Sequence, residues 1–179
     1  MNFMNIDYLK NGSSTQINVF KALRELQVPG RLSHFSPVLA GTFPLGLNIK
    51  GSDLDILCEV YDSDRFISRI QAAYGGQKGF YITVKALGGI PAIIGRFEYS
   101  GFPVEVFGQP KPVTDQHAFL HLQVEYQLLQ DRLRNKEAEL RSLKRRGWST
   151  EEAFAALLEL KGDPYKALIA LGDQMGLFT

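Results

Sequence analysis

The chain has 179 residues, enough for one domain of ordinary size or for a compact domain with a smaller appendage. Hydrophobic residues make up 45% of it and charged residues 22%, a composition that excludes a disordered or membrane-embedded chain. Twenty basic and nineteen acidic residues give a formal net charge of +1, so a nucleic-acid or membrane partner would have to be met by a local patch.

The cellular setting is expected to be reducing, because the one cysteine, Cys58, leaves no internal disulfide and no cysteine-rich zinc site. Cys58 lies in an apolar run, where a packed thiol is favoured over a reactive one. The first residues lack the basic start and apolar run of a signal peptide, and no apolar run is long enough to span a membrane. We therefore expect a cytoplasmic protein without a membrane partner.

Turn and capping residues divide the first part of the chain into short helices and strands. Ser13 and Gln16 have the spacing of a capping box, and Pro29 cannot continue a helix. The elements expected in chain order are a helix from Ser13 to before Pro29, a strand at about 37–40, a Gly41-Thr42 turn, a strand at about 52–60, and a helix capped by Asp62 or Ser63 that ends at Gly75-Gly76.

An antiparallel pair of strands is expected at about 92–99 and 102–107. Ser100-Gly101 is a link of hairpin length with glycine in its second place. Alternation along the second strand puts Glu105 on the face opposite to its valine neighbours. One more strand is expected at about 81–84.

The character of the sequence changes near 109–113, after which it is almost continuously helical in period. We place a boundary there, which gives an α+β domain over residues 1–112 and a helical domain over residues 113–179. We expect the helical domain to close one side of a cleft.

The helical part contains apolar residues spaced alternately three and four apart from Phe119 to Leu143. This spacing predicts one long helix or two collinear helices. Ser149 and Glu152 form a second capping box, and Asp163 is an expected N-cap because proline follows it. Several helices therefore pack on one another or back onto the first domain.

Two carboxylates share one face of the strand at about 52–60. Residues two apart in a strand point the same way, so Asp53 and Asp55 face one side while Leu54 and Ile56 face the core. Like charges this close usually need a cation, and hard divalent ions such as Mg²⁺ prefer oxygen ligands. Glu105 is the natural third ligand, because it too lies in an apolar strand. The alternative is that the pair is only the polar outer face of an edge strand.

The Gly41-Thr42 step upstream offers a place for phosphate. Glycine lets the backbone approach a ligand closely, and the Thr42 hydroxyl and nearby amides could hold phosphate oxygens if a helical turn begins at 43–47. The step alone is more often an ordinary turn, so its meaning depends on the carboxylates that follow.

Together these residues resemble the signature of the polymerase-β-like nucleotidyltransferase superfamily. The matching features are Gly41-Thr42, a spacer of ten residues, Asp53-Leu54-Asp55-Ile56, and Glu105 in a later strand. Thr42 stands where serine is usual and keeps the hydroxyl. The resemblance covers about residues 13–108, and the C-terminal GDPYKAL resembles a small, uncharacterised bacterial family of the superfamily. It implies an α+β fold, a small mixed sheet flanked by helices, followed by a helical domain.

The resemblance also implies a reaction. A nucleoside monophosphate would pass from a nucleoside triphosphate to a hydroxyl acceptor with release of pyrophosphate, and a small-molecule acceptor is favoured over RNA or protein. Two Mg²⁺ (or Mn²⁺) ions are expected with the bound nucleotide, held by Asp53, Asp55 and Glu105. Phosphate contacts are expected from Gly41, Thr42 and Ser52. The competing interpretation is a non-catalytic binding or regulatory module of the same fold, such as a toxin-antitoxin partner.

Three further features have open interpretations. His117, His121 and Glu125 are spaced four apart on a predicted helix. They are interpreted as a surface or domain-facing stripe, as contacts to the acceptor, or as part of a zinc site. The basic segment 132–146 is typical of a solvated helix face, with a nucleic-acid patch as the minority alternative. Arg96 could reach a triphosphate or pair with a carboxylate.

Overall fold

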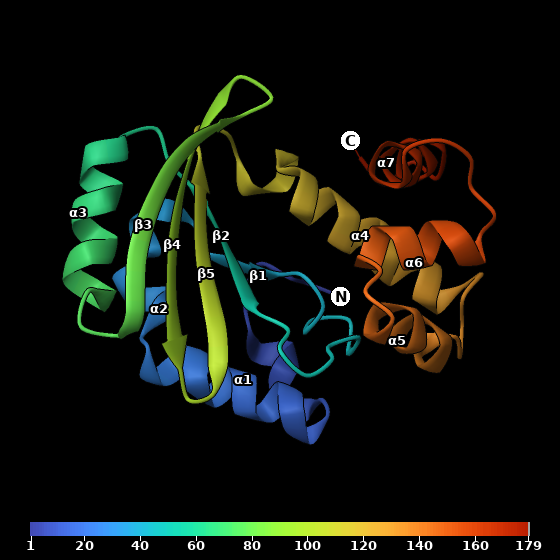
Figure 1. Ribbon diagram of the computed structural model, residues 1–179, viewed down its shortest axis with the longest axis horizontal. Helices are drawn as coiled ribbons and strands as arrows, with labels where there is room; N and C mark the ends of the chain where they lie inside the picture. The colour runs from blue at the N-terminus through green and yellow to red at the C-terminus, as the bar shows by residue number, and fades with distance from the viewer. Residues whose placement is uncertain (179) are drawn as a thin grey trace.

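Five strands form one mixed sheet with helices packed against it (Figure 1). This computed structural model describes residues 1–178. The strand order is β1-β2-β5-β4-β3, with β2 and β5 parallel and the other neighbours antiparallel. The strands are β1 (Val38–Ala40), β2 (Leu54–Glu59), β3 (Lys78–Leu87), β4 (Ile90–Tyr99) and β5 (Phe102–Gln109). The α+β class and the mixed sheet predicted from the sequence are confirmed.

The helices begin at the capping residues that the sequence indicates. The Ser13 side chain accepts a hydrogen bond from the Gln16 amide, and the Asp62 side chain accepts one from the Arg65 amide. The capping box at Ser149 is also present. The α-helices are α1 (Ser14–Glu25), α2 (Val28–Arg31), α3 (Ser63–Tyr74), α4 (His117–Gln130), α5 (Glu137–Arg145), α6 (Thr150–Leu157) and α7 (Pro164–Gln174). Short 3₁₀ turns lie at η1 (Asp7–Asn11), η2 (Ser33–Phe35) and η3 (Val113–Asp115).

The first face of the sheet is covered by the N-terminal half of the chain. Leu54 and Ile56 of β2 are fully buried there against α1 and α3, which contribute Leu23 and Phe66 to the same core. Cys58 belongs to this core, and burial raises the pKa of its thiol far above the usual range. The predicted packed thiol is therefore confirmed.

The second face is covered mainly over β1 and β2, by the helices α4 to α7. Val38 and Leu57 of these strands share a core with Leu122 of α4, Phe154 of α6 and Leu168 of α7. Figure 1 shows these helices gathered at the β1 side of the sheet and away from β3 and β4. The part of this face that they leave open carries Glu105 and Arg96, and Asp55 lies at its border with the helices.

Two local expectations need correction. Of the two alternatives expected from Phe119 to Leu143, one long helix is wrong, because turns over 131–135 interrupt it and Asn135 has a φ of +66°. The chain forms two helices there, α4 and α5. The strand expected at 81–84 is longer, because β3 pairs along almost its whole length with β4.

The hairpin link at Ser100-Gly101 is confirmed. Both residues have positive φ, +47° and +82°, as the two central residues of a type I′ turn require. The turn sets the register of β4 on β5, with Tyr99 opposite Phe102. Across residues 1–178, none of the helices combines the length and the apolarity needed to cross a membrane.

Candidate functional site

One row of residues crosses all five strands on the open face of the sheet. Asp55 of β2 lies opposite Glu105 of β5, Glu105 lies opposite Arg96 of β4, and the row ends at Ala40 on β1 and Tyr81 on β3. Directly opposed residues in neighbouring strands are close enough for their side chains to interact. We call Asp55, Glu105 and Arg96 the charged row.

The aspartates face away from the core as expected. Leu54 and Ile56 are buried in the first face, whereas Asp53 is exposed and Asp55 is partly buried on the opposite side. The strand that follows Asp53 is not an edge strand, because β2 lies between β1 and β5. An edge position therefore does not explain the pair of carboxylates.

Asp55 is held in an unfavourable setting for a charge. Burial, together with the nearby charges of Asp53 and Glu105, raises its pKa to about 8. Lys144 opposes this shift. The charges of Asp53 and Glu105 thus repel that of Asp55, and a cation placed among the three carboxylates would reduce this repulsion.

Glu105 has a partner already. Its Oε2 forms a hydrogen-bonded ion pair with Nη2 of Arg96, so the carboxylate partner considered for Arg96 is the one found. Among residues 1–178, no group of three or more histidine, cysteine, aspartate or glutamate side chains stands ready to hold a metal ion. Asp53 and Asp55 are available to a cation, whereas Glu105 is engaged with Arg96.

Gly41 lies so close to Asp55 that a side chain at this position would displace the Asp55 carboxylate. Its φ is +68°, and a Cβ built on it would lie 2.1 Å from Oδ2 of Asp55. The turn after it is closed by the Leu47 amide, which donates to the Thr42 carbonyl at 3.0 Å, and residues 43–47 form turns rather than a helix. Thr42 is buried, and the Ser52 hydroxyl accepts a hydrogen bond from the Ile49 amide at 2.9 Å.

A polar cavity of about 340 Å³ separates these residues from the C-terminal helices. Its sheet side is formed by the turn and the aspartates, and its helical side by residues of α4, of the end of α5 and of the start of α6. The lining residues are Gly41, Thr42, Ser52, Asp53, Asp55, Ala118, His121, Glu125, Lys144, Ser149, Thr150 and Glu151. All three predicted phosphate-binding residues therefore face the same space as the two aspartates.

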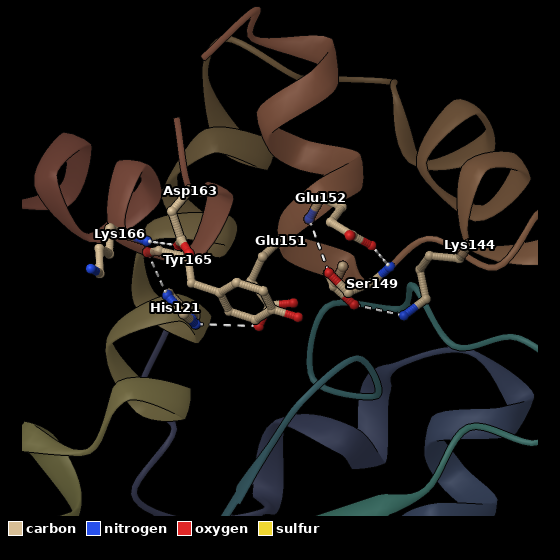
Figure 2. Close-up of polar contacts among 9 residues, drawn as sticks. His121, Lys144, Ser149, Glu151, Glu152, Asp163, Tyr165 and Lys166 are labelled. Atoms are coloured by element: carbon tan, nitrogen blue, oxygen red, sulfur yellow. Dashed lines mark hydrogen bonds and ion pairs between the residues drawn. The ribbon is translucent and has the colours of Figure 1, made fainter. Parts of the chain in front are cut away.

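His121 joins the helices on the far wall of this polar cavity (Figure 2). Its Nδ1 lies 3.2 Å from Oε1 of Glu151 in α6, and its Nε2 lies 3.0 Å from the Tyr165 carbonyl oxygen in α7. Although burial raises the pKa of Glu151, the hydrogen bond with His121 brings it below its usual value. The two partners of the ring are a carboxylate oxygen and a backbone carbonyl oxygen.

Glu125 and Lys144 also line the helical side of the polar cavity. Glu125 is 3% exposed, and its Oε1 has no hydrogen-bond partner in the described part of the chain. Burial raises the pKa of Glu125 well above its usual range, and the charge of Glu151 adds to this. Burial lowers the pKa of Lys144, against the pull of Glu125, Glu151 and Asp55, and its Nζ donates to Oγ1 of Thr150 at 2.7 Å.

The stripe of His117, His121 and Glu125 is divided between two cavities. His121 and Glu125 are buried and line the polar cavity, whereas His117 is exposed and lines a second, more apolar cavity. Lys144 was missed from the sequence because its place in the last turn of a helix indicates only a favourable charge at a helix end. Its position opposite the aspartates depends on how α5 and α6 pack.

Comparison with solved structures identifies the class of fold. The polymerase core of TRAMP, an RNA surveillance complex, aligns with a TM-score of 0.52 at 14% identity, over 93% of this chain and 51% of that one. The Cid1 poly(U) polymerase bound to MgGTP aligns with a TM-score of 0.46 at 18% identity, over 66% of this chain and 38% of that one. The chain thus spans about half or less of these structures. It has the nucleotidyltransferase fold of the TRAMP polymerase core.

The family is shown by a match over residues 21–171 to a domain of unknown function, DUF4269. The chain belongs to this family. No curated protein matches the sequence.

Proposed function

We propose that this protein is a Mg²⁺-dependent nucleotidyltransferase, which moves a nucleoside monophosphate from a nucleoside triphosphate to a hydroxyl acceptor. The observation that carries the proposal is that Asp53 and Asp55 line the polar cavity together with Gly41, while Glu105 lies opposite Asp55 on the neighbouring strand. Three carboxylates in this setting serve no packing purpose and carry an electrostatic cost. Binding of a metal ion together with a triphosphate would offset this electrostatic cost.

The residues present fit one or two divalent ions. Asp53 and Asp55 would hold Mg²⁺ (or Mn²⁺), and Glu105 would complete the set by exchanging Arg96 for the ion. When bound, the ions would neutralise triphosphate charge and favour ionisation of the acceptor hydroxyl. The raised pKa of Asp55 supports this fit, because crowded, buried carboxylates gain most from a nearby cation.

The chain itself would position the nucleotide. Gly41 leaves room for a phosphate close to the backbone, and the Thr42 and Ser52 side chains line the same cavity. Lys144 would contact phosphate oxygens from the helical wall, because its ammonium is partly buried among four carboxylates rather than held by one ion pair. Phosphoryl transfer depends mainly on such positioning and charge neutralisation.

A small-molecule acceptor remains the favoured one, and RNA the alternative. Part of the basic segment 132–146 is engaged within the chain. Arg141 donates to the Gly46 carbonyl at 2.8 Å, Lys136 pairs with Glu139 at 2.7 Å, and Lys144 lines the polar cavity. We retain in this proposal the cytoplasmic location, the origin in a small bacterial family, and the division of the chain at 112/113.

The experiment that tests the proposal screens the four nucleoside triphosphates for Mg²⁺-dependent binding by calorimetry and for pyrophosphate release. Asp53→Asn is expected to abolish both with the fold intact, because one oxygen charge at the proposed ion site is lost. Asp173→Asn, an exposed aspartate in α7, is the matched control and should behave as wild type. Undiminished Mg²⁺-dependent binding in Asp53→Asn would contradict the proposal, and binding without transfer to any hydroxyl acceptor would support the non-catalytic module instead.

Lys144→Met is expected to weaken nucleoside triphosphate affinity about tenfold or more, because a hydrogen bond between charged groups contributes roughly 1.5–3 kcal/mol. The loss should shrink for a nucleoside monophosphate, which lacks the outer phosphates. Lys136→Met, at the exposed start of α5, is the control. Calorimetric titration with the triphosphate and the monophosphate measures the difference, and an equal loss for both ligands would argue against contact with the outer phosphates.

A further inference from the structure

A second cavity, of about 440 Å³, lies on the other side of the charged row. Asp55 and Glu105 line it, but of the residues that line the polar cavity it shares only Asp55 and Ala118. A molecule bound in it would therefore reach the carboxylates without displacing a triphosphate from beside Lys144. We call it the apolar cavity.

The walls of the apolar cavity are mostly hydrocarbon. Leu57 and Phe107 follow Asp55 and Glu105 on the same face of β2 and β5 and lie opposite each other. Leu87 and Ile90 pair with each other at the tip of the β3–β4 hairpin, beside Gly88-Gly89, and also line the cavity. They remain 39% and 37% exposed, although exposed aliphatic side chains at a hairpin tip serve no purpose in packing. The hairpin tip reaches beyond the rest of the sheet in Figure 1.

A buried polar atom in the wall also lacks a partner. Gln116 is 1% exposed, and its Nε2 donates to the carbonyls of Cys58 at 2.9 Å and Lys111 at 3.3 Å. These two bonds fix the orientation of the amide, and they leave its Oε1 unpaired within residues 1–178. An unpaired buried acceptor is costly, so a ligand that donates a hydrogen bond to it would be favoured.

We propose that the apolar cavity is the acceptor site, and that the acceptor is a compact, mainly apolar hydroxyl compound of aromatic or alicyclic type. The inference rests on the proposed function and goes beyond it by naming the acceptor class. The volume falls within the range of roughly 300–1,000 Å³ that is usual for small-molecule sites. RNA would instead need a groove with several cations, whereas Lys111 is the one lysine or arginine among the cavity residues in the described chain.

The transfer is balanced without a further reactant. The acceptor oxygen forms a bond to the α-phosphorus, and the bond from that phosphorus to the bridging oxygen breaks. Pyrophosphate leaves with the electron pair, and the hydroxyl proton passes to solvent water. Asp55 and Glu105 in the cavity wall would place the ion site beside the bound hydroxyl.

The test uses 2-naphthol as a fluorescent probe and the substitution Ile90→Asp, which puts a carboxylate in the apolar wall. Because Ile90 is already partly exposed and lies at a hairpin tip, the substitution should leave the fold intact. Loss of the apolar contact should weaken naphthol binding at least about tenfold. Val84→Asp is the matched control, since Val84 is a more exposed aliphatic residue of the same hairpin that does not line the cavity.

Three measurements separate this inference from the proposed function. Nucleotide affinity should be equal in wild type, Ile90→Asp and Val84→Asp, and failure of wild type to bind any nucleotide would overturn the proposed function itself. With nucleotide bound, naphthol should bind undiminished, whereas competition would assign the cavity to the nucleobase and overturn the inference alone. With α-labelled nucleotide, label should pass to naphthol and not to an RNA oligonucleotide. Labelled RNA, with Ile90→Asp having no effect, would also overturn the inference.

Discussion

Gly41→Ala is expected to abolish Mg²⁺-dependent nucleotide binding while lowering the free energy of unfolding by only about 1–2 kcal/mol. The moderate loss of stability comes from the φ of +68°, which costs any residue that carries a Cβ. The functional loss comes from Asp55, because the new methyl group would stand 2.1 Å from its Oδ2. That carboxylate must turn away, and a misplaced ligand no longer serves the ion site.

Gly46→Ala separates the two effects. Gly46 has nearly the same φ, +67°, but a Cβ at this position would meet nothing within 4 Å. Both variants should therefore lose similar stability in chemical denaturation, and only Gly41→Ala should lose nucleotide binding in calorimetry. Equal nucleotide affinities in the two variants would show that the position of Asp55 does not matter for binding.

Asp55→Asn is expected to stabilise the metal-free protein above about pH 8. Its pKa of about 8 in the folded protein stands above the ordinary value of 3.8, so the folded state holds the proton more tightly than the unfolded state. The stabilisation from the neutral carboxyl is complete below pH 3.8 and is lost as pH rises through about 8. Since one pKa unit corresponds to about 1.4 kcal/mol, the loss is at most about 6 kcal/mol.

Urea denaturation in the presence of a chelator, at intervals between pH 4.5 and pH 9, measures this dependence. Wild type should lose stability across the range, and Asp55→Asn should lose much less. Mg²⁺ at pH 9 should then restore the stability of wild type but not of Asp55→Asn, because an ion that binds the carboxylate stabilises the folded state. Asp173→Asn is the control and should follow the wild-type curve. If Asp55→Asn also followed the wild-type curve, Asp55 would not be the group responsible.

The positions of side chains that depend only on neighbouring residues in the chain could be predicted from the sequence. The positions that depend on how helices pack could not. Side chains alternate along a strand, so Asp53 and Asp55 point to one face whatever the rest of the fold does. The Ser13 cap forms within one helical turn. Lys144 enters the polar cavity only through the packing of α5 and α6 against the sheet. No periodicity in the sequence reports that packing.

The pairing of Glu105 shows the same limit at closer range. Its strand and its face could be predicted from alternation, but its engagement with Arg96 follows from the register set by the Ser100-Gly101 turn. The break at Asn135 is a further case, because the apolar spacing continues across it and only the backbone changes direction. Sequence periodicity alone therefore favours a longer helix than the chain forms.

The parallel pairing of β2 with β5 also bears on how the molecule comes to fold. β3, β4 and β5 are joined by two-residue turns and can associate early, whereas β2 must find β5 across all of the chain that lies between them. The repulsion between Asp55 and Glu105 thus arises only when one of the slowest contacts of the sheet forms. This repulsion therefore does not arise in the folding chain until most of the sheet has formed.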